Sequence, residues 1–304
     1  MKLTLDRKTK TIEYTERHPS IEVKRLTSRG EMLSYIETNR CHAVTAFAHL
    51  DASFPEIARW HAATDGERFA LCLIAKGLFP TYIFTMGDAE MLGLLVESIG
   101  MPGRAFFTCE AEHLETLRNI YQIEWHLSMK RMMVTEGEFT PVAEKATRLR
   151  PAQVAEINAL YAQEKASNFT SAQIRRGAFH GIWRDGQLVA VAGTHFIVPT
   201  YGIAYLGNVL THPQYRNQGL ATTCVSSVTT ELLKTCSEVV LNVEPYNLPA
   251  IRTYTGLGYR DKGQVVEGSG HRKSFVSVII SNMCRKFGLL PKYEERMEPD
   301  GESA

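Results

Sequence analysis

The sequence lacks paired cysteines. Its six cysteines are scattered along 304 residues, without the C-x-x-C spacing of a zinc site or the density of a disulfide framework. We therefore expect buried, reduced thiols and no bound metal. The chain also lacks an apolar run of about 20 residues, which a membrane-spanning helix requires, and the segment from Met1 to Lys8 is too polar for a secretion signal. These absences favour a cytoplasmic compartment.

An excess of charge of one sign is also missing. The 34 lysines and arginines nearly balance the 33 aspartates and glutamates. Proteins that bind nucleic acids or anionic membranes usually carry a basic excess, so we expect neither partner. With 44% apolar residues the chain has the composition of a globular protein, and its length allows two domains.

A polar segment, residues 136–147, interrupts the apolar periodicity near the middle of the chain. This interruption predicts an N-terminal α/β domain over residues 1–140, a second domain over residues 145–285 and a C-terminal tail over residues 286–304. Hydrophobic spacing and cap residues predict both helices and strands in the first half. These are helices at Ser28 to Thr38, Asp88 to Ile99 and Glu112 to Tyr121, and strands at Phe69 to Ala75, Arg104 to Cys109 and from Ile123 onward.

The second half has a clearer pattern. Asp185-Gly186 lies between two apolar runs, which is a strong signal for a two-residue hairpin turn. The order of elements predicts a mixed α/β fold with a mixed sheet. The predicted elements are a helix opening at Pro151, the hairpin, a strand at Ile203 to Leu210, a helix at Gly219 to Lys234, a strand at Val239 to Val243, a helix at Leu248 to Thr255 and a closing strand at Phe275 to Ile280.

The most informative segment is Arg216-Asn-Gln-Gly-Leu-Ala221, where a strand runs through a polar turn into the long helix. Gly219 lets the backbone approach a ligand closely at the point where the helix exposes free N–H groups. These amides and the positive end of the helix dipole bind phosphate, and Arg216 adds a charge. Alone, this pattern is equally typical of an ordinary turn between a strand and a helix.

A second segment follows about 30 residues later. It runs from Asn247 to Tyr259 and places Ala250 and Tyr254 on one face of a short helix, because residues four apart are neighbours. Asn247 suits the N-cap of this helix, and Pro249 suits its first turn.

With both segments present, residues 147–283 resemble the GNAT superfamily of N-acetyltransferases. The phosphate-binding signature appears as Arg216 to Ala221, after the frequent His-Pro-x-Tyr at His212 to Tyr215, and the second signature appears as Asn247, Ala250, Tyr254, Gly258 and Tyr259. The resemblance implies a GNAT fold with acetyl-CoA, or another acyl-CoA, bound between two strands that splay apart. The implied cofactor-binding residues are Val209, Leu210, Thr211, Arg216, Asn217, Gln218, Gly219, Leu220, Ala221, Thr222 and Asn247.

Acyl transfer to an amine requires a deprotonated amine, a polarised carbonyl and a proton for the thiolate. The resemblance implies that Tyr254 lies near the sulfur, and a phenol there can donate that proton. We expect the backbone N–H of Leu210 to polarise the carbonyl. Glu244 is our candidate base, and His195 and His212 are titratable alternatives for which structural roles are also open.

We therefore predict an N-acyltransferase that moves an acetyl or related short acyl group to a primary amine by direct attack. A small-molecule acceptor is favoured over a protein. The alternative is a non-catalytic, regulatory module that binds acyl-CoA. The first half has a similar order of elements but lacks the Arg-x-x-Gly-x-Ala pattern, which leaves open a degenerate, tandem GNAT-like domain or an unrelated α/β module.

Overall fold

The computed structural model describes residues 3–5, 11–14, 21–51, 57–77, 80–164 and 168–273. The strand predicted at residues 275–280 and the tail predicted at residues 286–304 lie outside these ranges. Within the described ranges, no helix has both the length and the apolarity to cross a membrane.

The first half of the chain forms helices packed on a mixed sheet. It opens with two short strands, β1 (Leu3–Leu5) and β2 (Thr11–Tyr14). The elements that follow are β3 (Ile21–Leu26), α1 (Arg29–Ile36), α2 (Val44–Leu50), β4 (Ile57–Thr64), β5 (Phe69–Lys76), β6 (Thr81–Gly87), α3 (Ala89–Ser98), β7 (Arg104–Cys109), α4 (Leu114–Ile120) and β8 (Tyr121–Thr135).

The second half repeats the order that begins at β3. The repeat consists of one strand, two helices, three strands, a helix, a strand, a helix and a final strand. Its members are β9 (Thr147–Arg148), α5 (Val154–Ala162), α6 (Ser171–Arg176), β10 (His180–Arg184), β11 (Gln187–Val198), β12 (Ile203–Thr211), α7 (Leu220–Leu232), β13 (Glu238–Val243), α8 (Leu248–Gly256) and β14 (Arg260–Arg272). The chain therefore consists of two similar α/β halves, which favours the GNAT-like alternative for the first half over an unrelated α/β module.

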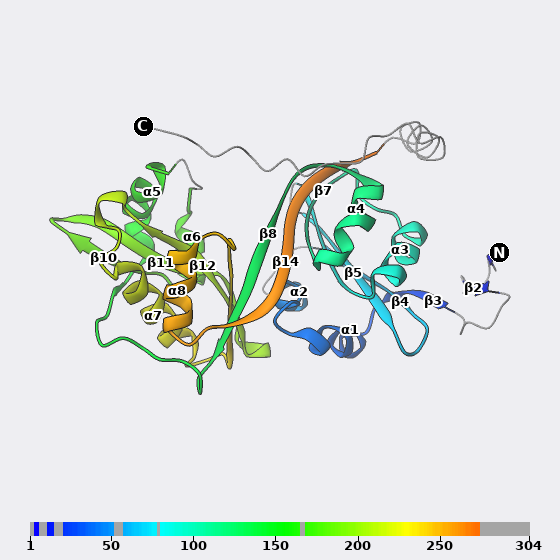
Figure 1. Cartoon of the computed structure of the whole chain (residues 1–304), viewed down its shortest axis with the longest axis horizontal. Coiled ribbons are helices and arrows are strands. Elements are labelled where there is room, and N and C mark those ends of the chain that lie inside the picture. The colour runs from blue at the N-terminus through cyan, green and yellow to red at the C-terminus, as the bar shows by residue number, and fades with distance from the viewer. Residues whose placement is uncertain are drawn as a thin grey trace.

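The two halves share one sheet because they exchange their last strands. The strand order is β1-β2-β3-β4-β5-β6-β7-β14-β8-β13-β12-β11-β10-β9. Strand β14 of the second half pairs with β7, and strand β8 of the first half pairs with β13. In Figure 1, β8 and β14 run side by side between the halves, and they pair with each other along most of their length. The separation into domains near residue 140 stays a prediction.

The predicted cap residues and the predicted hairpin turn are present in the structure. The side chain of Ser28 accepts a hydrogen bond from the N–H of Glu31, and the side chain of Asp88 accepts one from the N–H of Met91. In the hairpin between β10 and β11, Asp185 and Gly186 have φ values of 50° and 77°, and Asp and Gly adopt such positive angles readily. The predictions for these segments are confirmed.

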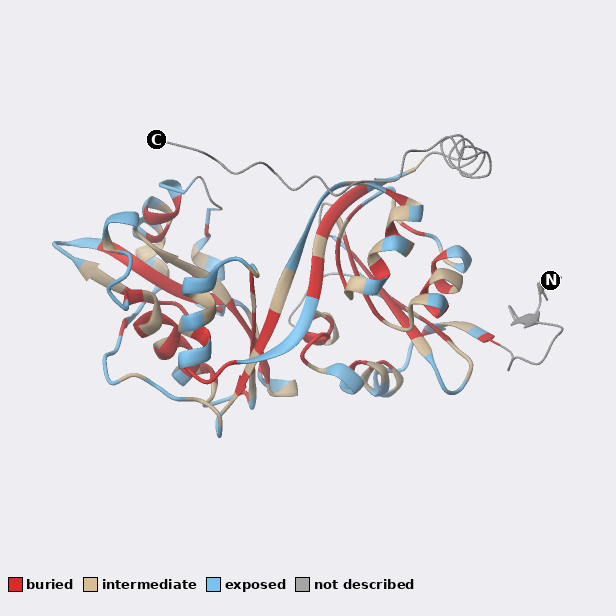
Figure 2. Cartoon of the chain, in the orientation of Figure 1, coloured by how far each residue is buried: buried red, intermediate tan, exposed pale blue. Residues whose placement is uncertain are grey.

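Hydrophobic faces hold the layers together. Helix α7 buries residues four apart in its sequence against the sheet, and Figure 2 shows such stripes of buried residues on the helices and along the central strands. One core cluster contains residues of both halves, including Phe47 and Leu71 from the first and Ile203 and Val240 from the second. The halves therefore share a core as well as a sheet.

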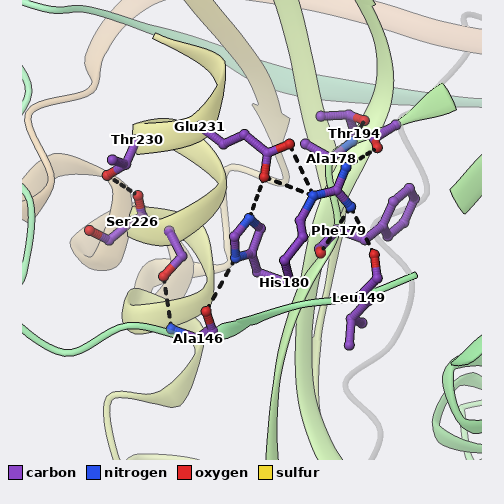
Figure 3. Close-up of polar contacts among 12 residues, drawn as sticks. Ala146, Leu149, Ala178, Phe179, His180, Thr194, Ser226, Thr230 and Glu231 are labelled. Atoms are coloured by element: carbon purple, nitrogen blue, oxygen red, sulfur yellow. Dashed lines mark hydrogen bonds and ion pairs between the residues drawn. The ribbon is translucent and has the colours of Figure 1, made fainter. Parts of the chain in front are cut away.

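The linker before β9, residues 136–146, is held to α7 by hydrogen bonds to serine side chains of the helix. The N–H groups of Val142 and Ala146 donate to the hydroxyls of Ser226 and Ser227, at 3.1 and 2.9 Å. Figure 3 shows His180 between this linker and the helix, where its Nδ1 lies 3.3 Å from the carbonyl oxygen of Ala146. Its Nε2 lies 2.6 Å from a carboxylate oxygen of Glu231.

Candidate functional site

The two strands at the centre of the second half separate after a short parallel stretch. Strand β12 pairs with β13 only from Ile203 to Tyr205. Beyond Tyr205 the edge of β12 that faces β13 has no strand partner among the described residues, although its other edge continues to pair with β11. Asn208 has a φ of 52°, and its side-chain amide donates to the carbonyl of Thr194 at 3.1 Å, which fixes the irregular step in β12. The predicted slot between the splayed strands is present.

Helix α7 begins at the mouth of this slot. Its N-cap, Gly219, has a φ of 76° and supplies no capping side chain. The first intrahelical bond that involves this cap runs from the N–H of Thr223 to the carbonyl of Gly219, so the preceding amides have no helical partner. This helix start combines free N–H groups with the positive end of the helix dipole, which is a suitable site for an anion.

Two arginines flank the helix start. Nη2 of Arg216 lies 2.5 Å from a carboxylate oxygen of Glu164, and its Nε donates to the carbonyl of Thr211 at 3.2 Å. Arg252 of α8 lines the same cavity and forms no ion pair with a described residue. Sequence reasoning did not single out Arg252, although its position on the motif helix could have indicated it.

Helix α8 closes the other side of the slot. The side chain of Asn247 accepts a hydrogen bond from the N–H of Ala250 at 3.2 Å, as the predicted N-cap. Tyr254 lies two turns into the helix and is 6% exposed. Burial raises the pKa of Tyr254 to about 12, so the phenol keeps its proton at neutral pH.

These elements enclose a cavity of about 680 Å³. All predicted cofactor-binding residues line it except Gln218, and Tyr254 lies at one end. Their roles stay predictions. The two motifs, separated by about 30 residues in the sequence, are on opposite walls of this cavity, hereafter the donor cavity.

A smaller cavity of about 240 Å³ adjoins the donor cavity and shares Val209, Asn247 and Tyr254 with it. The candidate base Glu244 and also His195 line this junction. Solvent reaches His195 through the cavities, but the surrounding protein lowers the pKa of its imidazole to about 4, mainly by desolvation. His212 lies elsewhere, and its Nδ1 accepts the N–H of Gln214 at 3.2 Å, which is a local role in the His-Pro turn.

The N–H of Leu210 does not face the slot. The N–H of His212 donates to the carbonyl of Val189 at 2.8 Å, and Leu210 lies opposite Val191 in the same ladder. Because bonds in an antiparallel ladder recur at every second residue, the N–H of Leu210 also points to β11. The expectation for Leu210 was wrong for this reason. The same alternation turns the N–H groups of Val209 and Thr211 toward the open edge.

Sequence reasoning also missed a second carboxylate at the junction, Glu267 of β14. One oxygen of Glu267 accepts a hydrogen bond from the side-chain amide of Asn242 at 2.8 Å. The Oδ1 of Asn242 accepts in turn from Nε of the buried Arg131 at 2.9 Å. No motif marks Glu267, because it comes to the site only through the exchange of β14 between the halves.

Comparison with known proteins agrees with this geometry. Residues 146–259 match the model of the acetyltransferase (GNAT) family. No curated protein matches the chain significantly.

Solved structures show the same fold over most of the chain. A Drosophila protein is similar with a TM-score of 0.60 and 12% identity, over 81% of this chain and 98% of its own. A GCN5-related N-acetyltransferase from Sphaerobacter thermophilus gives a TM-score of 0.52 and 14% identity, over 84% and 97%. A GCN5-related N-acetyltransferase-like protein from Streptococcus suis gives 0.51 and 13%, over 80% and 100%. Residues 146–259 are an acetyltransferase domain of the GNAT family, and the chain is an acyltransferase that uses an acyl-CoA donor.

Proposed function

We propose that this protein transfers an acetyl group, or a related short acyl group, from acyl-CoA to a primary amine by direct attack. The observation that carries the proposal is the meeting of two cavities at Tyr254, one lined by the phosphate-binding helix start and the other by two carboxylates. A donor and an acceptor can then approach the same point from opposite sides, which direct transfer requires.

Different parts of the donor cavity suit the pyrophosphate, the pantetheine arm and the thioester of acyl-CoA, in that order from the helix start to Tyr254. The free amides from Leu220 to Thr222 hold the pyrophosphate, with Arg216 and Arg252 as flanking cations. Arg216 either keeps its pair with Glu164 or exchanges it for phosphate. The open edge of β12 bonds to the pantetheine amides as a neighbouring strand would. The thioester then lies at Val209, which both cavities share. The backbone N–H of Val209 donates to the carbonyl oxygen of the thioester and polarises it.

Tyr254 supplies the proton for the leaving thiolate. Its hydroxyl makes no hydrogen bond to any described residue, and its raised pKa keeps it protonated at neutral pH, so the phenol can donate a hydrogen bond to the sulfur and pass on its proton as the C–S bond breaks. The phenol therefore favours an enzyme over a module that only binds acyl-CoA. Glu244 remains a candidate base at the same junction.

The test is release of free thiol from acetyl-CoA by the purified protein with a panel of primary amines. We expect amine-dependent release, and we expect Tyr254→Phe to lower kcat by about 10- to 100-fold with acetyl-CoA affinity retained. Thr255→Val, at an exposed position of the same helix outside the lining of the donor cavity, serves as the control. Tight acetyl-CoA binding without thiol release for any amine would instead identify a regulatory module.

A further inference from the structure

A third cavity, of about 500 Å³, lies where the two halves of the protein meet. The first half supplies His49, Tyr82 and Phe106 to it, and the second half supplies Phe196 and Tyr205. Two sets of rings form its walls. Tyr82 stacks between His49 and Phe106, with centroids 5.4 and 6.0 Å away, and Tyr205 packs edge-on against Phe196 at 5.4 Å. We call this space the aromatic cavity.

The aromatic cavity opens toward the reaction point. It shares His195, Tyr205 and Glu267 with the junction cavity, which in turn shares Tyr254 with the donor cavity. A molecule in the aromatic cavity can therefore extend one end past Glu267 toward the thioester. Beyond the cavity, the same sheet face continues with Trp125 and Leu127, which are 47% and 39% exposed.

The charged groups of the aromatic cavity are few. Glu267 is the one carboxylate among its described lining residues, and no described lysine or arginine lines it. A carboxylate or phosphate on the acceptor would have no cationic partner there, and a second ammonium would have no second anion. The lining thus suits a molecule with one amine and an apolar body.

Glu267 is held in place by a polar chain. Its Oε1 accepts from the amide of Asn242 at 2.8 Å and from the hydroxyl of Tyr205 at 3.5 Å. Arg131 is 2% exposed and fixes the orientation of Asn242 through the bond to Oδ1. No described residue donates to Oε2 of Glu267, so this oxygen is available to an ammonium.

We propose that the acceptor is an apolar monoamine with an aromatic ring or a body of similar size, bound in the aromatic cavity, with Glu267 as the group that takes its proton. This inference rests on the proposed acyl transfer and specifies its acceptor.

With Glu267 and Tyr254 at these positions, every proton and electron pair of the transfer has a donor and an acceptor. Glu267 takes one proton from the ammonium, and the lone pair of the nitrogen forms the C–N bond. Collapse of the tetrahedral intermediate breaks the C–S bond, and the thiolate takes the proton of Tyr254. The second proton lost by nitrogen returns to the phenolate, and the proton on Glu267 leaves to solvent. The net products are the amide, CoA thiol and one proton.

The first experiment compares acceptors that differ in one feature. With acetyl-CoA saturating, we expect kcat/KM for 2-phenylethylamine to exceed the values for phenylalanine and spermidine by at least about 10-fold. Phenylalanine adds only a carboxylate to the same skeleton, and spermidine replaces the ring with further amines. A higher kcat/KM for phenylalanine or spermidine would overturn the inference while leaving acyl transfer in place.

The second experiment tests Glu267 directly. Glu267→Gln keeps an oxygen for Asn242 to bond, so we expect the fold and the acetyl-CoA affinity by calorimetry to be retained. At pH 7.5 its kcat/KM should fall by about 100-fold, and the deficit should shrink as the pH approaches about 10, where amines lose their proton in solution. Phe106→Ala should raise KM for 2-phenylethylamine. Glu115→Gln, an exposed carboxylate of α4, is the matched control.

Two results would overturn the inference while leaving acyl transfer in place. One is a pH-independent deficit in Glu267→Gln, which would indicate a structural role. The other is a deficit in Glu244→Gln with wild-type activity in Glu267→Gln, which would move the proton transfer to Glu244. Acetyl-CoA binding with no turnover of any amine would be different, since it would refute the proposed function and this inference with it, as would failure to bind acetyl-CoA at all.

Discussion

At the scale of single residues, the helix start of α7 depends on the backbone of Gly219. Its φ of 76° is in the left-handed region, and a Cβ added there would meet no atom within 4 Å. A side chain at this position therefore costs backbone strain and points into open space, which is where the phosphates are expected. Sequence reasoning found Gly219 because a short motif and a local turn define its role.

We predict that Gly219→Glu abolishes acetyl-CoA binding, because the new carboxylate fills and charges the phosphate site. Gly219→Asn is the matched control, since Asn tolerates the same φ without a charge and should weaken binding only several-fold. Isothermal calorimetry on both variants, with circular dichroism as a check of folding, measures the difference. Unchanged affinity in a folded Gly219→Glu variant would contradict the site.

A second prediction at the scale of single residues concerns stability at low pH and the buried His42. Burial, and then the nearby Arg131, lower the pKa of His42 to about 3. Its Nε2 donates to the carbonyl of Thr85 at 3.1 Å. The folded state thus binds fewer protons than the unfolded state, whose histidines have a pKa of about 6.5, so stability falls as the pH drops from about 6.5 toward 3.

For His42 alone the expected loss between pH 7 and pH 5 is about 2 kcal/mol. Urea unfolding at these two pH values should show a smaller loss in His42→Gln, whose amide can also donate to Thr85, than in the wild type. His271→Gln, at an exposed position of β14, should keep the wild-type loss. Equal losses in His42→Gln and the wild type would exclude His42 as the cause.

At the scale of elements, the sequence predicted those with a clear period or cap. Helices α7 and α8, strands β12 and β13 and the β10–β11 hairpin all follow local patterns. Strand β14 was not predicted, because its first residues, from Arg260 to Gln264, are exposed and polar. Its partners β7 and β8 are more than 120 positions away in the chain. Glu267 was missed with it, since nothing near it in sequence indicates the cavity.

The contacts behind α7 give a prediction for this helix. Glu231 pairs with Nε2 of His180 at 2.6 Å and with Nε of Arg148 at 2.8 Å, which ties α7 to β9 and β10. We expect Glu231→Gln to lower the free energy of unfolding by about 1 to 2 kcal/mol, because Arg148 loses its anionic partner and His180 loses a charged hydrogen-bond partner. Chemical denaturation measures this, and Glu156→Gln, on the exposed face of α5, is the control. Equal stability of both variants would show that the contact is not stabilising.

At the scale of the whole molecule, the sequence predicted two halves but not their exchange of strands. The interruption at residues 136–147 lies between β8 and β9, yet β8 before it and β14 far after it each pair with a strand of the other half. Pairing between distant strands is decided by the whole sheet and by the shared core, where Phe47 packs near Tyr201 with ring centroids 5.3 Å apart. No local pattern contains this information.

We therefore expect the two halves to unfold together. Tryptophans report on each half, because Trp60 lies in β4 and Trp183 in β10. Variants that retain only one of the two, with the other tryptophans replaced by Phe, should show coincident thermal transitions, and these should match the far-ultraviolet circular dichroism. Two separate midpoints would show that the halves are independent despite the shared strands.

The exchange of β14 also has a consequence for biosynthesis. During translation, residues from Ile21 to Thr135 leave the ribosome long before Arg260. Strands β7 and β8 are therefore synthesised well before β14, which pairs between them in the folded protein. Pairing over such sequence separations gives a high contact order, which slows folding and leaves strand edges open to wrong partners. A nascent chain of this enzyme therefore has a long interval in which chaperones can affect its yield.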